Sequence, residues 1–100
     1  MSLQNFRAYQ LSIRFYHACL GLKLPRHLRE QLLRAASSIS LNLAEGYAKP
    51  TRKDQNKFFY ISMGSLRESQ AVLALARLDS PGLIDIADHL GACLHKLTSS

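Results

Sequence analysis

The chain has 100 residues, of which 47% are hydrophobic and 20% are charged, and its formal net charge is +6. A chain of this size and balance can bury a core of its own, which excludes an intrinsically disordered protein and favours one globular domain. No apolar run is long enough to cross a membrane, so we expect no membrane-spanning segment.

The first two predicted helices cover residues 3–20 and 25–48, where apolar side chains recur every three or four positions. Gly21 follows the first helix where a C-terminal cap is expected. The second helix begins at Pro25, because the missing N–H group of proline needs no partner in a first turn. Gly46 and Pro50 are expected to end it.

The third and fourth predicted helices cover residues 52–78 and 83–97. Thr51 followed by Asp54 resembles a capping box at the start of the third helix. Short connections between long helices make each helix antiparallel to the next. The sequence therefore predicts an all-α, up-down-up-down antiparallel four-helix bundle that forms one domain over residues 1–100.

The two central helices are rich in small side chains. Small residues let helix backbones approach closely, and here they fit either the contact between these two helices or a contact with another subunit. Single chains seldom leave wide apolar surfaces uncovered, so we favour a homo-oligomer. The small residues are Ala35, Ala36, Ser37, Ser38 and Ser40 on the second helix and Ser62, Gly64, Ser65 and Ser69 on the third.

The positive charge is concentrated in the first part of the chain, since residues 1–57 contain ten of the 13 Lys and Arg residues but three of the 7 acids. The antiparallel topology brings the turn near residue 50 beside the start of the first helix and the end of the fourth. Such a cluster favours contact with nucleic-acid phosphates without base readout; the alternative is an ordinary solvated surface. The cations at this end are Arg7, Lys49, Arg52, Lys53, Lys57 and Lys96.

The sequence contains none of the motifs of an enzyme or of a metal site. The four histidines and the cysteines Cys19 and Cys93 lack HExxH or CxxC spacing, so we expect no metal, cofactor, small-molecule substrate or catalytic residue. Glu45 and Glu68 could be a catalytic pair, but buried or interfacial structural acids are the favoured interpretation. Free thiols and an N-terminus without a signal peptide predict a cytoplasmic protein.

Residues 31–70 carry a pattern that resembles the four-helix bundle family of the 23S rRNA intervening-sequence proteins. In that family a helix with the pattern Q-x-x-R-A-x-x-S-I-x-x-N-x-A-E-G is followed by one with F-x-x-x-x-x-G-S-L-x-E. The first pattern falls on Gln31, Arg34, Ala35, Ser38, Ile39, Asn42, Ala44, Glu45 and Gly46, and the second on Phe58 or Phe59, Gly64, Ser65, Leu66 and Glu68.

This resemblance implies a bundle that assembles into a ring-like homopentamer and has no established enzymatic activity. Family members are encoded in intervening sequences of bacterial 23S rRNA genes, and a related branch contains the accessory variability determinants of diversity-generating retroelements. Those determinants are basic pentamers that bind nucleic acid and a reverse transcriptase. The function expected here is therefore a nucleic-acid-binding accessory or scaffold protein; the alternative is a structural or protein-interaction module. The motif residues expected to act as structural or interface positions are Arg34, Ser38, Asn42, Glu45, Gly46, Ser65 and Glu68.

Overall fold

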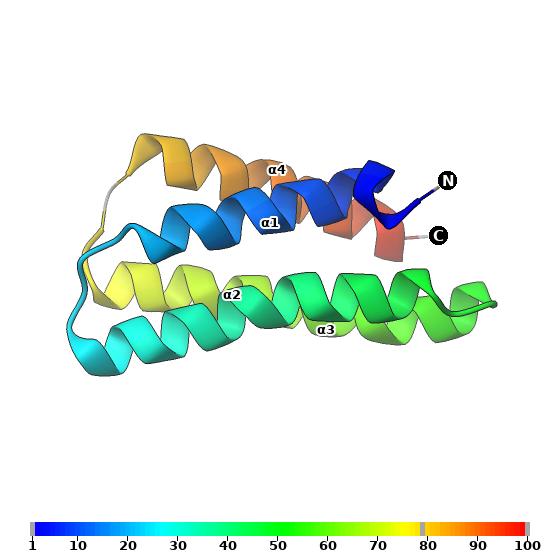
Figure 1. Cartoon of the computed structure of the whole chain (residues 1–100), viewed down its shortest axis with the longest axis horizontal. Coiled ribbons are helices and arrows are strands. Elements are labelled where there is room, and N and C mark those ends of the chain that lie inside the picture. Colours follow the sequence, from blue (N-terminus) through cyan, green and yellow to red (C-terminus); the bar gives the residue numbers. More distant parts are fainter. Residues whose placement is uncertain (1, 79, 100) are drawn as a thin grey trace.

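The structure is a computed structural model that describes residues 2–78 and 80–99, and it consists of helices joined by short connections. A 3-10 turn, η1 (Leu3–Asn5), precedes α1 (Arg7–Leu20), α2 (Arg26–Tyr47), α3 (Arg52–Leu75) and α4 (Pro81–Thr98). The helices alternate in direction along a rod of 40 × 22 × 22 Å (Figure 1). This confirms the predicted four-helix, all-α architecture. None of the described helices is long and apolar enough to cross a membrane.

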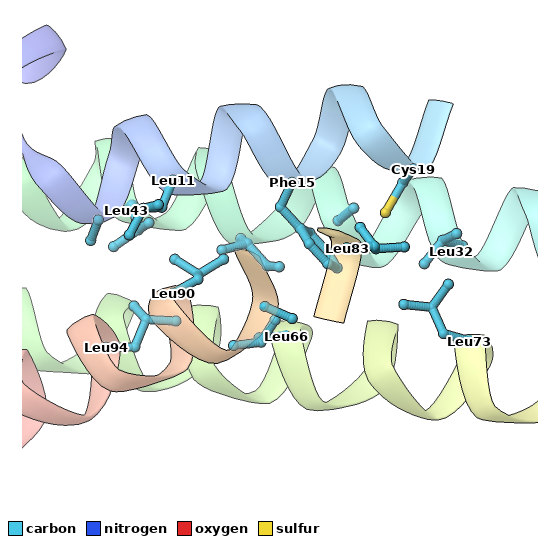
Figure 2. Packing of buried hydrophobic residues seen from close by; sticks show 14 of the residues in the cluster. Leu11, Phe15, Cys19, Leu32, Leu43, Leu66, Leu73, Leu83, Leu90 and Leu94 are labelled. Carbon is cyan, nitrogen blue, oxygen red and sulfur yellow. The ribbon is translucent and has the colours of Figure 1, made fainter. Parts of the chain in front are cut away.

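The core lies along the axis of the rod and takes side chains from every helix. Phe15 of α1, Leu32 of α2, Leu66 of α3 and Leu90 of α4 are all fully buried, and Figure 2 shows their apolar side chains filling the space between the four ribbons. Each such side chain stabilises the fold by about 1.5–3 kcal/mol through burial. The 3.6-residue period of the sequence therefore reports these buried positions correctly.

The small residues of α2 and α3 serve mainly the contact between these helices, which is the most extensive in the bundle. Ser62 is fully buried and donates to the Ile39 carbonyl at 2.9 Å, and Ser65 donates to Ser38 Oγ at the same distance. Ser40 donates instead to Ser12 Oγ of α1 at 2.9 Å. Close helix approach and satisfied hydroxyls therefore account for most of this stripe.

The start of the first helix and the expected role of Gly46 need correction. The first helix is not continuous from residue 3, because Phe6 is extended (φ −76°, ψ 111°) and separates η1 from α1. The centre of its ring lies 5.2 Å from the centre of the Tyr47 ring and 5.9 Å from that of the Phe59 ring. Packing of the Phe6 ring against these two rings outweighs continued helical hydrogen bonding. Gly46 does not end α2; it is buried inside the helix, which continues through Tyr47.

The ends of α3 show one predicted and one unpredicted cap. Thr51 Oγ1 accepts a hydrogen bond from the Asp54 N–H at 3.2 Å, which confirms the predicted N-cap. The helix ends at Leu75, three residues earlier than expected. Arg77 there adopts a left-handed conformation (φ 55°), while the Leu78 and Arg77 N–H groups bond to the carbonyls of Leu73 and Ala74 at 3.1 Å. This is a Schellman motif.

Replacing Arg77 by glycine is expected to stabilise the fold by about 0.5–1 kcal/mol, because a left-handed conformation is unfavourable for a side chain with a Cβ atom but not for glycine. Urea unfolding followed by circular dichroism measures the change. Arg77→Ala is the control, since it removes the same charge and keeps the Cβ atom. Equal midpoints for the two variants would contradict the prediction.

Candidate functional site

The candidate site is the end of the rod where both termini and the α2–α3 turn meet (Figure 1). The first turn of α1, the last turn of α2, the start of α3 and the end of α4 lie at this end. We call it the basic pole, and it holds all six cations selected from the sequence: Arg7, Lys49, Arg52, Lys53, Lys57 and Lys96. The two acids expected nearby, Glu45 and Asp54, also lie here.

Three of these cations surround one groove, which has a volume of about 440 Å³. Arg7 comes from α1, Arg52 from α3 and Lys96 from α4. Apolar or weakly polar side chains from η1–α1 and α4 line the rest. The α1–α4 groove is defined by Phe6, Arg7, Ala8, Arg52, Cys93, Lys96 and Leu97.

Arg52 is held in position by the end of α4. Its Nη2 donates to the Leu97 carbonyl oxygen at 2.9 Å, and Tyr60 Oη donates to the Thr98 carbonyl at 2.9 Å. These bonds satisfy carbonyl groups that have no partner within α4. They also fix the start of α3 against the end of α4, so the guanidinium of Arg52 is anchored beside the groove.

The other three cations lie outside the groove. Lys49 Nζ is 3.4 Å from Glu45 and 5.2 Å from the centre of the Phe58 ring. Lys57 Nζ is 3.7 Å from Asp54, and Lys53 is exposed on α3. These ion pairs are partly exposed and weak, so phosphate groups can compete for their cations.

Helix dipoles divide five of the six cations into two groups. Lys96 is in the last turn of α4 and Lys49 follows α2, where the dipole favours positive charge. Arg7 is the first residue of α1, and Arg52 and Lys53 begin α3, where the dipole disfavours a cation. The first turn of α1 also contains no acid. The helix dipoles therefore give no reason for the cations at Arg7 and Lys53, whereas Arg52 is held by its bond to the Leu97 carbonyl.

The motif residues expected to act as structural or interface positions follow the seam between α2 and α3. Ser65 bonds to Ser38, and Asn42 Nδ2 donates to Ser38 Oγ at 3.0 Å. Gly46 is packed against α3, and a Cβ atom there would lie 2.8 Å from Cε1 of Phe59. Arg34 lies exposed on α2. Most of this motif thus builds the α2–α3 contact rather than the basic pole.

Glu45 and Glu68 are both exposed and stand apart, so of the expected buried or interfacial acids neither is buried within the bundle. Glu68 Oε2 accepts from Gln31 Nε2 at 3.3 Å, while Glu45 pairs with Lys49. Gln31 and Glu45 are fourteen positions apart on α2, a separation of about 21 Å along the axis. The two carboxylates therefore do not form a pair.

The two cysteines differ in environment. Cys19 is buried in the core, and this burial raises the pKa of its thiol to about 12. Cys93 is partly exposed and lines the α1–α4 groove. Within residues 2–78 and 80–99, no three His, Cys, Asp or Glu side chains are gathered closely enough to hold a metal ion.

The apolar floor of the groove is not predictable from the sequence. Ala8, Cys93 and Leu97 look like ordinary members of helical stripes, and Phe6 looks like a core residue at the start of a longer helix. The sequence does place Cys93 and Leu97 on either side of Lys96 near the end of the last helix, and this position is a signal that could have indicated the groove. Only the packing of α4 against α1 brings this group beside Arg7.

Comparison with known proteins agrees with the motif found in the sequence. The family model for the 23S rRNA-intervening sequence protein matches residues 4–85, which include part of η1, all of α1, α2 and α3, and the start of α4. No curated protein and no solved structure matches the chain. A match over this much of the chain shows that it belongs to the family of 23S rRNA-intervening sequence proteins.

Proposed function

We propose that this protein is a non-enzymatic accessory or scaffold protein that binds the phosphate backbone of RNA or DNA through its basic pole. The observation that carries the proposal is the presence of Arg7 and Lys53 in the first turns of helices, where the helix dipole disfavours positive charge. A surface that keeps cations against the helix dipole fits an anionic partner better than a need for solubility.

The charge pattern favours phosphate over an acidic protein as the partner. The cations of the basic pole come from separate helices and most extend into solvent, an arrangement that suits the repeated charges of a flexible polyanion. Backbone phosphates bind such a surface without sequence readout. An acidic protein partner is the alternative outcome of the experiment below.

Homo-oligomerisation is part of the proposal, and large apolar side chains exposed on the outside of the bundle support it. Leu41 of α2 is 68% exposed and Leu75 of α3 is 72% exposed. Covering them would recover burial energy, as expected for an interface between subunits. A ring-like homopentamer, which the family resemblance suggests, would gather the basic poles into one annulus that could also receive a reverse transcriptase.

The test is the salt dependence of RNA binding, measured by fluorescence anisotropy with a labelled single-stranded RNA. Contact with three to six phosphates predicts that log K falls against log[salt] with a slope of about −2 to −4. Sedimentation with and without RNA follows the subunit count in the same buffers. A slope near zero, or no binding in dilute buffer, would overturn the proposal. An acidic protein that stays bound after nuclease treatment would establish the alternative.

A further inference from the structure

The α1–α4 groove combines two surfaces that a simple phosphate-binding patch does not need together. Positive charge around the groove comes from Arg7, Arg52 and Lys96. The apolar surface between these cations comes from Phe6 and Leu97. Its volume of about 440 Å³ lies within the range of pockets that bury small organic ligands. The natural occupant is a compact group that is apolar on one side and anionic on the other.

We infer that the α1–α4 groove holds one unpaired nucleotide of a single-stranded nucleic acid, with its phosphate near the cations and its base against the apolar floor. This inference rests on the proposed function and deepens it by naming the form of nucleic acid that is bound. Single-strand-binding proteins combine the same two elements, a basic track for the backbone and apolar or aromatic surfaces for the bases.

A single strand fits the groove better than a duplex does. The bases of a duplex are stacked on one another, so a duplex can offer only phosphates to the rim and leaves the floor at Phe6 and Leu97 uncovered. A single strand also fits better than a free nucleotide. The cations outside the groove, Lys49, Lys53 and Lys57, lie at the same pole and can hold the neighbouring phosphates of a continuous strand.

The lining also predicts that the site tolerates any base. Among its seven side chains there is no Asn, Gln, Asp or Glu, the groups that read the edges of adenine and cytosine, and its Arg and Lys side chains, which can read guanine, are assigned here to the phosphates. Contact through the flat face of the base is sequence-tolerant, because every base has such a face. Single strands of different sequence should therefore bind with similar affinity.

Cys93 provides a direct probe of occupancy, because its thiol lines the groove. Cys19 is the internal control, since it is buried and its pKa is raised to about 12, which keeps the thiol protonated and unreactive. The intact protein is treated with N-ethylmaleimide alone and with a short single-stranded RNA, the matching duplex, AMP or inorganic polyphosphate. Mass spectrometry measures the rate of Cys93 alkylation, and anisotropy measures binding in the same samples.

We expect the single strand, at about ten times its Kd, to slow Cys93 alkylation roughly tenfold. AMP should protect only at far higher concentration, while the duplex and polyphosphate should bind without protecting. Arg7→Gln should weaken protection, whereas Arg14→Gln, which removes an exposed cation of α1 outside the groove, should leave it unchanged.

The outcomes separate this inference from the proposed function. Saturation by single-stranded RNA with Cys93 still fully reactive would overturn the nucleotide site and leave backbone binding intact. Equal protection by polyphosphate would also overturn it, since the apolar floor would then play no part. If neither RNA nor polyphosphate binds in dilute buffer, both the inference and the proposed function fail.

Discussion

Replacing Gly46 by alanine is expected to destabilise the bundle by about 1–3 kcal/mol, although alanine is the better helix former. Gly46 is buried in α2, where a Cβ atom would lie 2.8 Å from Cε1 of Phe59 and 3.0 Å from Cβ of Phe58. The ring of Phe59 is buried and in contact with Phe6, so it cannot move away without opening the core. The cost of overpacking therefore exceeds the gain in helix propensity.

Gly64→Ala is the matched control for this prediction. Gly64 also lies inside a helix, but it is exposed and a Cβ atom there would meet nothing within 4 Å. Alanine should therefore stabilise α3 by about 0.5–1 kcal/mol. Urea unfolding of both variants measures the two changes, which should have opposite signs. Stabilisation by Gly46→Ala would show that α2 and α3 are farther apart at this end than described.

Reversing the charge at both Arg7 and Lys53 to glutamate should weaken RNA binding while it stabilises the fold. Two lost phosphate contacts reduce affinity on the order of 10- to 100-fold at low salt. Both positions lie in the first turn of a helix, where a carboxylate is favoured and a cation is not, so the free energy of unfolding should rise by about 1–2 kcal/mol. Anisotropy and urea unfolding measure the two effects separately.

The control for charge is the double change Lys23→Glu and Arg26→Glu at the opposite end of the rod. It alters the net charge by the same amount, and Arg26 is likewise the first residue of a helix. Its exposed pair with Glu30, at 3.0 Å, contributes little. If this control weakens RNA binding as much as the first pair, net charge and not the basic pole governs affinity. Loss of stability in the first pair would refute the dipole argument.

The sequence by itself determines the four helices, their alternating direction and the end at which the cations meet. These features follow from local information: apolar residues at a 3.6-residue period, prolines between the segments and the Thr51 cap. Antiparallel order then places residues near 7, 52 and 96 together, whatever the details of packing. The family pattern on α2 and α3 is equally visible in the sequence alone.

Only the tertiary structure decides what lies across from each buried face. Periodicity shows that Ser62 faces inward, but it shows neither that Ser62 donates to the Ile39 carbonyl nor that α3 approaches Gly46 closely. It also does not show that the ring of Phe6 packs against Tyr47 and interrupts the first helix. The floor of the α1–α4 groove has the same origin, since it exists only where two helices far apart in the chain meet. The physical reason is that helix formation depends on neighbours along the chain, whereas grooves, close approaches and buried hydrogen bonds depend on residues that are distant in sequence and adjacent only after folding.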